Sequence, residues 1–305
     1  MFKICQFEFS HVIISEEYKN NRGDEMKWKI VTDTGSSIRE IENLPENVSF
    51  DIIPLILHVD DKDFVDTPDL DIKELVKEMS KSSKSSSACP APGVYAEKFK
   101  GAENVICFTI SSEISGSYNS AELGRSLALE ENPNANIYIF NTKSAGSEMD
   151  LLVWKALDLI KEGESFQGVV DGLIAYHDHT YVGYMLKSIE NLVKNGRVNK
   201  VVGSLVGLLN IHVMGIRSEK GTIEMSNRAR GEKRALNTFM NDLIENGFNG
   251  KILEISHVNN QTLAEKFASK MKEKFPNTNV RIRPTSGLCS FYAEDGGLIV
   301  GYERK

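Results

Sequence analysis

From Met26 onward, short runs of β-branched and apolar residues alternate with longer segments whose apolar residues recur at helical spacing. The runs predict buried strands, and the longer segments predict helices that pack on them. In the first half we predict strands over 27–33, 50–59, 104–110 and 136–140, a short helix near Val94, and helices over 71–79, 119–131 and 147–161. Strand and helix alternation of this kind predicts an α/β fold with a mostly parallel, Rossmann-like sheet and crossover helices.

The second half has a different pattern, which predicts a mixed α+β domain. Strands are predicted over 180–186, 211–217, 222–225, 252–257, 279–283 and 298–302, and helices over 189–194, 233–245 and 262–274. Two of these strands are joined around Glu219-Lys-Gly221, which is typical of a hairpin. We therefore expect a first domain over 26–170 and a second over 171–305. Residues 1–25 end in a polar, breaker-rich stretch and are expected to be a weakly ordered extension.

Composition and charge exclude several classes of protein. The chain of 305 residues has a formal net charge of −7, which disfavours a general nucleic-acid binder. No apolar run is long enough to span a bilayer, and the first residues lack the order of a secretory signal. The four cysteines show no CxxC spacing, so we expect no zinc site and no disulfide framework. The expected location is the cytoplasm, and we expect no metal and no cofactor.

Three local patterns suggest chemistry but have simpler interpretations. His177-Asp-His179 could suggest a metal site, yet no third ligand is evident, so an ordinary loop is expected. The basic run Arg228–Arg234 is expected to be the exposed start of a helix. The serine-rich tract 81–87 is expected to be a loop.

The segment Ile110–Ala121 is a hydroxyl-rich turn between a predicted strand and a predicted helix. It places Ser115, Gly116 and Ser117 at the carboxyl end of a strand, where open α/β sheets usually bind ligands. The turn offers hydroxyls and backbone N–H groups but no strong base, so it is better suited to hold an anion than to attack a substrate. It lacks the G-x-S-x-G motif, although a serine nucleophile can be assembled in space from distant residues.

Several ordered blocks of the sequence resemble motifs of the DegV family of bacterial fatty-acid-binding proteins. The resemblance runs from about Met26 to Tyr302, and Ile110-Ser-Ser-Glu-Ile-Ser-Gly-Ser-Tyr-Asn-Ser-Ala121 is its most specific match. The other blocks are Val31–Ser37, Ser87–Gly93, Asn195-Gly-Arg197, Leu208–Ile211 and Arg230-Gly-Glu-Lys233.

The resemblance implies a DegV-like protein of two domains that holds one long-chain fatty acid, such as palmitate, in a buried apolar tunnel. The carboxylate would be bound by Ser87, Ser115 and Gly116. A carboxylate taken out of water must keep its hydrogen bonds, and hydroxyl and amide groups donate them without adding a second charge. The acyl chain would supply the affinity, at roughly 0.8 kcal/mol per buried methylene before ordering costs.

The resemblance also implies a partner. In family members that serve fatty-acid kinase, a separate kinase subunit phosphorylates the bound carboxylate, and the binding protein performs no chemistry alone. Arg230 matches the family arginine associated with that transfer, and Arg197 matches the one in the family's Gly-Gly-Arg turn. We therefore expect a lipid-binding protein without catalytic residues, with only transient membrane contact and no nucleic-acid partner.

The chain departs from the family pattern near its C-terminus. The family's His-Thr-Gly-Pro-Gly-Ala motif is replaced by Phe291–Gly297, with Tyr292 nearest the histidine position. Tyrosine can donate a hydrogen bond, so Tyr292 is expected to join the carboxylate site, whereas Glu294 and Asp295 would repel an anion if they pointed inward. Two alternatives stay open: a serine-dependent hydrolase or acyltransferase acting on a lipid ester through Ser115, and a regulator that binds another small anion.

Overall fold

The computed structural model describes residues 26–198 and 210–305. The predicted extension over residues 1–25 lies outside the described residues, as do Leu208 and Leu209 of one family-like block. The N-terminal half forms sheet A, four parallel strands in the order β2-β1-β6-β7. Its strands are β1 (Met26–Asp33), β2 (Val48–Ile53), β6 (Ala102–Thr109) and β7 (Asn136–Asn141). The predicted parallel α/β sheet is confirmed.

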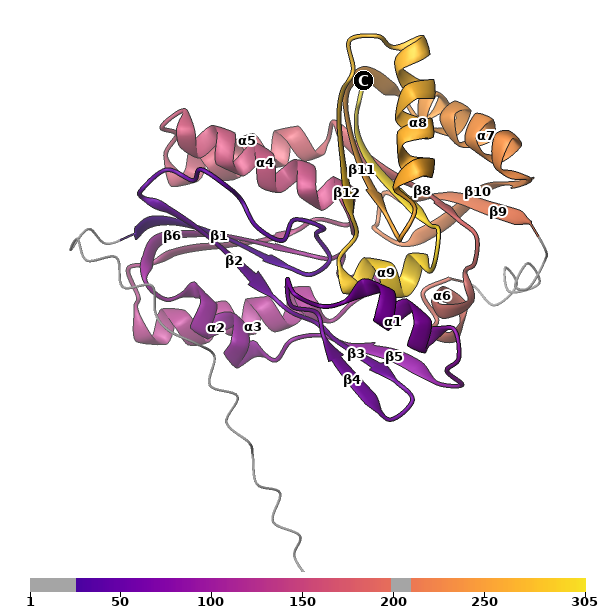
Figure 1. The fold of residues 1–305 in the computed structure, drawn as a ribbon. Coiled ribbons are helices and arrows are strands. Elements are labelled where there is room, and N and C mark those ends of the chain that lie inside the picture. The colour runs from indigo at the N-terminus through magenta and orange to yellow at the C-terminus, as the bar shows by residue number, and fades with distance from the viewer. Residues whose placement is uncertain (1–25, 199–209) are drawn as a thin grey trace, which may run out of the picture.

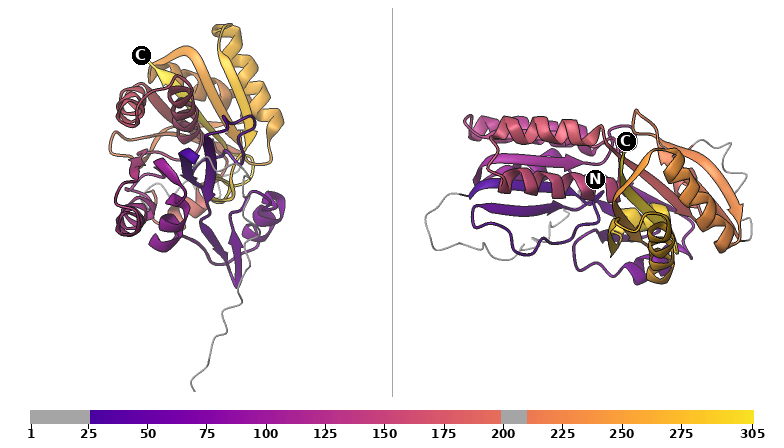
Figure 2. Two further views of the ribbon diagram at one scale, coloured as in Figure 1. Left: turned by 90° about the vertical axis from the view of Figure 1, so that its left-hand side faces the viewer. Right: turned by 90° about the horizontal axis from the view of Figure 1, so that it is seen from above.

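Helices cover both faces of sheet A, which gives three layers (Figures 1 and 2). Side chains along β6 alternate between the two cores: Val105 and Cys107 pack under α2 and α3, and Ile106 and Phe108 under α4 and α5. A Cβ at Gly124 would lie 2.5 Å from the Cβ of Tyr95, so glycine lets α2 and α3 approach closely. The helices are α2 (Pro92–Phe99), α3 (Ser117–Glu131), α4 (Ser147–Lys161) and α5 (Phe166–His177).

Sheet C, in the second half, is mixed and has the strand order β10-β9-β8-β13-β11-β12. Two helices, α7 (Glu232–Glu245) and α8 (Gln261–Lys274), cover one face over a core that includes Phe239 and Phe267. The other face meets α4, and a Cβ at Gly301 would lie 2.4 Å from the carbonyl oxygen of Ser147. The strands are β8 (Thr180–Leu186), β9 (Ile211–Arg217), β10 (Ile223–Arg230), β11 (Phe248–His257), β12 (Asn279–Pro284) and β13 (Leu298–Arg304).

A small antiparallel sheet, sheet B, has the order β4-β3-β5 and lies beside α1 (Ile72–Met79), α6 (Glu190–Lys194) and α9 (Gly287–Ala293) (Figure 1). The prediction of one strand over 50–59 was wrong: β2 ends at Ile53 and β3 begins at Ile56, with Pro54 between them. The prediction of a loop over 81–87 was also wrong at its end, because Ser85–Ala88 pairs with β3 as β5. The remaining strands of sheet B are β3 (Ile56–Val59) and β4 (Lys62–Val65).

Two further boundaries differ from the predictions. Helix α5 was not predicted, and His177 is its last residue rather than part of a loop. A Cβ at Gly172 would lie 2.8 Å from Cδ1 of Leu159, so glycine at this position lets α5 pack closely on α4. Only the last part of the basic run opens a helix: Arg228 and Arg230 belong to β10, and α7 begins at Glu232. The division into domains at residue 170 stays a prediction.

Candidate functional site

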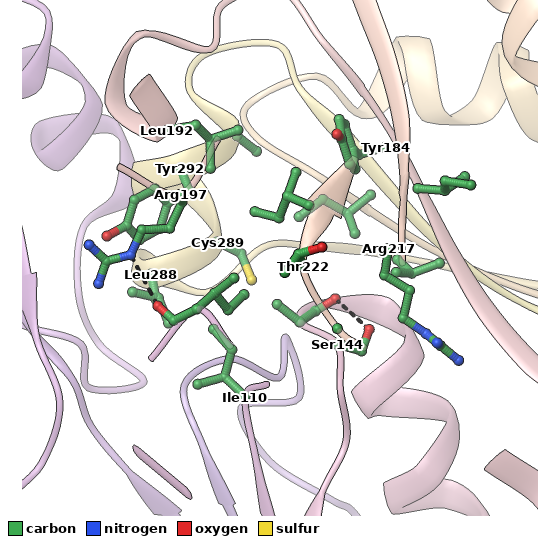
Figure 3. A pocket seen from close by; sticks show the side chains of 18 of the residues that line it. Ile110, Ser144, Tyr184, Leu192, Arg197, Arg217, Thr222, Leu288, Cys289 and Tyr292 are labelled. Atoms are coloured by element: carbon green, nitrogen blue, oxygen red, sulfur yellow. Dashed lines mark hydrogen bonds between the residues drawn. The ribbon is translucent and has the colours of Figure 1, made fainter. Parts of the chain in front are cut away.

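An apolar cavity lies between the carboxyl edge of sheet A and the face of sheet C that meets α4 (Figure 3). About 760 Å³ of space inside it is free of protein atoms, part of it open to solvent. The loops after β6 and β7, strands β8, β9 and β13, and helix α9 supply most of the wall. Its lining residues include Ile110, Ile114, Val182, Tyr184, Leu186, Leu192, Ile216, Ile223, Leu288, Cys289 and Ile299.

Two hydroxyl groups meet at one end of this cavity. Tyr292 on α9 lines the cavity, and its Oη lies 2.8 Å from Oγ of Ser87 on β5. Ser87 is opposite the fully buried Leu57 in the sheet register, so its side chain points to the inner face of sheet B. The structure thus brings together two predicted site residues that are 205 positions apart.

Arg197 lies at the same end of the cavity (Figure 3). Its Nε donates to the carbonyl oxygen of Ile114 at 3.0 Å, and its guanidinium carbon lies 6.0 Å from the centre of the Tyr292 ring. The other recorded hydrogen bond of the guanidinium goes to the carbonyl of Asn195. Within 26–198 and 210–305, Arg197 therefore has carbonyl partners but no carboxylate partner to neutralise its charge.

The predicted turn lies directly behind this end. The hydroxyls of Ser115 and Ser117 are 3.0 Å apart, and the Ser117 amide donates to Ser115 Oγ at 3.2 Å. Gly116 is exposed, and a Cβ there would lie 3.1 Å from Sγ of Cys89, so the turn touches the segment that follows Ser87. Ser87, Ser115 and Gly116 are beside the cavity wall rather than in it.

The turn gives no sign of an activated nucleophile. The recorded contacts of the Ser115 hydroxyl are with the hydroxyl and amide of Ser117, whereas a serine nucleophile needs a neighbouring base to take its proton. In the part of the chain that the structure describes, no group of three or more His, Cys, Asp or Glu residues could hold a metal ion. The arrangement is suited to hydrogen bonding of an anion.

The remaining residues of interest lie away from the cavity. Arg230 is exposed at the end of β10 and does not line it, so the two candidate arginines occupy different places. Glu294 accepts a hydrogen bond from the Asn191 amide at 3.0 Å, and Asp295 accepts one from Asn259 at 3.2 Å. Neither carboxylate lines the cavity, so the repulsion that would follow from an inward orientation is avoided.

One group behind the site was missed by sequence reasoning. Asp33 ends β1, is fully buried, and accepts hydrogen bonds from the amides of Gly35 and Ile110, both at 2.9 Å. It therefore ties the loop after β1 to the loop after β6. Burial raises the pKa of this carboxyl to about 7, against the opposing effect of its backbone donors. The bond to Gly35 is a local turn contact, but the Thr-Asp-Thr sequence gives no signal for the bond to Ile110, which is 77 positions away.

The sequence model of the family described as "Uncharacterised protein, DegV family" matches residues 27–305. The chain belongs to the DegV family. Among curated DegV relatives, a DegV domain-containing protein of Streptococcus gordonii is 43% identical over 279 residues, which cover 91% of this chain and 99% of that protein. No described helix of this DegV protein is long and apolar enough to cross a bilayer.

Solved structures of DegV proteins share the fold and contain fatty acids. The fatty acid kinase (Fak) B3 protein of Streptococcus pneumoniae, loaded with linoleic acid, is 41% identical with a TM-score of 0.89, and the match covers 92% of this chain and 100% of that one. A DegV protein of Eubacterium eligens loaded with heptadecanoic acid is 35% identical with a TM-score of 0.87, over 91% and 100% of the two chains. The predicted fold class and family are therefore confirmed.

Proposed function

We propose that this DegV protein binds one long-chain fatty acid in the cavity, with the carboxylate at the end formed by Ser87, Tyr292 and Arg197. The observation that carries the proposal is the pair of hydroxyls, 2.8 Å apart, at one end of a cavity lined mostly by apolar side chains: Tyr292 lines the cavity, and Ser87 lies just behind it. The two similar structures that hold linoleic and heptadecanoic acid support the same ligand class.

The chemistry of the two ends fits a fatty acid. A buried carboxylate needs hydrogen-bond donors, and Ser87, Tyr292 and Ser115 each carry an O–H that can donate to it. The guanidinium of Arg197 adds a positive charge that has no carboxylate partner among residues 26–198 and 210–305. Each methylene of the tail that leaves water contributes roughly 0.8 kcal/mol before ordering costs. Tyr292 thus takes the place of the histidine that the family pattern contains.

The same proposal assigns no catalysis to the chain itself. The protein would present the bound acid to a fatty-acid kinase, which would form the acyl phosphate, and the name of the Fak B3 relative supports this partner. Arg230, exposed at the end of β10, is available to a partner surface, whereas Arg197 lines the cavity and would contact the ligand.

The direct test is to identify what the purified protein carries. Native mass spectrometry and lipid extraction should find one long-chain fatty acid per chain. A cavity that is repeatedly empty, or that holds a polar ligand, would refute the proposal. Labelling of Ser115 by a fluorophosphonate probe would instead favour the serine-dependent hydrolase or acyltransferase.

The turn can be tested separately. Ser115→Ala should weaken fatty-acid binding several-fold, because it removes a hydroxyl beside the carboxylate end. Ser126→Ala on helix α3, which follows the turn, is the matched control, since the Ser126 hydroxyl is exposed and its hydrogen bond goes to the Glu122 carbonyl. Equal affinities for the two variants, measured by isothermal titration, would remove Ser115 from the site.

A further inference from the structure

The carboxylate site that we propose depends on the placement of α9 relative to sheet B. Ser87 comes from sheet B, whereas Tyr292 comes from α9, a helix of 7 residues after β12. Helices this short are not stable by themselves, so tertiary contacts must fix the position of α9. The distance between the two hydroxyls therefore depends on whatever holds α9 against sheet B.

A carboxylate of sheet B holds the N-terminal end of α9. Asp66 directly follows β4, is fully buried, and accepts hydrogen bonds from the amide of Gly287 at 2.8 Å and that of Leu288 at 2.7 Å. One carboxylate oxygen accepts each amide, and a negative charge at this end of a helix is favourable. The Arg39 guanidinium donates to the same carboxylate at 2.9 Å and neutralises its charge.

Glycine at 287 is what permits this contact. A Cβ at this position would lie 2.6 Å from Oδ1 of Asp66 and 2.6 Å from Cδ2 of Leu70. The leucine side chain can move, but the carboxylate is held by three donors, two of them on Oδ1. A larger residue would push Asp66 off the helix amides, so the bonds from Asp66 to α9 require glycine at position 287.

Sheet B also holds the other end of α9. Ser85, the second inward serine of β5, donates from Oγ to Oδ1 of Asn191 at 2.7 Å. The Nδ2 of Asn191 donates to the carbonyl oxygen of Phe291 at 2.9 Å, next to Tyr292. Both ends of α9 are thus bonded, directly or through Asn191, to the sheet that carries Ser87.

We propose that Asp66 is a positioning residue for fatty-acid binding: its carboxylate holds α9 where the Tyr292 hydroxyl faces Ser87. This inference rests on the proposed function. In this proposal Asp66 does not contact the ligand. It sets the distance between the two hydroxyls that bind the carboxylate.

The first test compares binding of a fatty acid with binding of the primary alcohol of the same chain length. In Asp66→Asn the amide nitrogen would face an N–H donor, so one of the two bonds to α9 is lost. Asp66→Asn should reduce the preference for the acid over the alcohol by about tenfold, the value of one hydrogen bond to a charged group. Gly287→Ala should do the same and serves if Asp66→Asn does not fold.

The matched control is Asp71→Asn, which removes another helix-capping carboxylate. Asp71 is exposed, accepts hydrogen bonds from the amides of Lys73 and Glu74 at the start of α1, at 2.8 and 3.1 Å, and does not line the cavity. This variant should leave the preference for the acid unchanged. A merely structural role of Asp66 would weaken acid and alcohol alike, and that result would overturn the proposal.

The second test needs no ligand. Hydrogen–deuterium exchange of the peptide that contains Gly287–Ala293 should be faster in Asp66→Asn than in the wild type and unchanged in Asp71→Asn. Unchanged exchange in Asp66→Asn would overturn the positioning role. A wild-type protein that binds neither acid nor alcohol would refute the proposed function, while the exchange of α9 would still decide whether Asp66 positions this helix.

Discussion

Tyr292→Phe removes one oxygen atom from the proposed carboxylate site and leaves the rest of the side chain. The ring of Tyr292 packs edge-on against Phe291 with centroids 4.9 Å apart, and phenylalanine keeps that contact. The lost group is the Oη that lies 2.8 Å from Ser87 Oγ. The variant therefore tests the hydroxyl alone.

The size of the expected effect follows from the ligand's charge. A hydrogen bond to an ionised carboxylate contributes about 1.5–3 kcal/mol, so the Kd for a fatty acid should rise by about 10-fold to 150-fold. The contribution of the acyl chain should not change, because the apolar wall of the cavity is preserved. The free energy of unfolding should fall by only about 0.5–1.5 kcal/mol, the usual value of one neutral hydrogen bond.

Displacement of a fluorescent fatty acid measures the Kd values, with the primary alcohol of equal length as the uncharged comparison. Tyr184→Phe is the matched variant: Tyr184 also lines the cavity, but its hydroxyl donates to the carbonyl of Glu224 at 2.7 Å. A Kd for the acid within about twofold of wild type in Tyr292→Phe would refute the reasoning, as would equal losses for acid and alcohol. A loss of the same size in Tyr184→Phe would show that the effect is not specific to the carboxylate end.

Three further predictions test the charge, the pH dependence and the packing around the cavity. Arg197→Gln should weaken fatty-acid binding by up to about tenfold and reduce its salt dependence, which titrations at low and high salt would show. The raised pKa of Asp33 means that the folded protein holds this proton more tightly, so its contribution to stability is present below about pH 4 and lost by about pH 7. As the pH rises across that range, the free energy of unfolding measured in urea should fall less for Asp33→Asn than for wild type. Equal falls in the two proteins would contradict this prediction. Gly215→Ala should lower the free energy of unfolding by at least about 1–3 kcal/mol, because its Cβ would lie 2.0 Å from the hydroxyl of Tyr184. Gly93→Ala, with open space at its Cβ, should leave thermal stability unchanged or higher, and equal melting temperatures for the two would contradict the packing argument.

The local sequence was sufficient to predict those parts of the fold whose structure is determined by neighbouring residues. Strands β1, β6 and β7 were predicted from their apolar runs, and the turn at Ser115 was predicted because an apolar run, a hydroxyl-rich turn and a helix follow each other in the chain. Tyr292 was predicted as a site residue only through its position relative to the family pattern, and its contact with Ser87 now supports that alignment. The contact itself spans 205 positions, and no local pattern could have shown it.

The local sequence did not predict the elements whose structure depends on contacts with distant residues. Helix α9 was missed although Ser286 caps it locally, because the helix has only 7 residues and two of its first amides are bonded by Asp66, which is 221 positions away from Gly287. Strand β5 was taken for a loop because Ser85–Ala88 is polar, yet its inner face bonds to Tyr292 and Asn191 instead of packing on apolar side chains. In β5, hydrogen bonds to remote partners replace the apolar periodicity on which prediction depends.

The strand order of sheet C has a consequence for how the protein is made. Strand β13 follows the other strands in the described sequence, yet it lies inside the sheet and joins β8 to β11. Until residues 298–304 have left the ribosome, β8 and β11 have no partner between them, and Ile299 is missing from the cavity wall. Pairings between such distant segments form late and slowly. The nascent chain can fold sheet A early, but ligand capture must wait until residues 298–304 have left the ribosome.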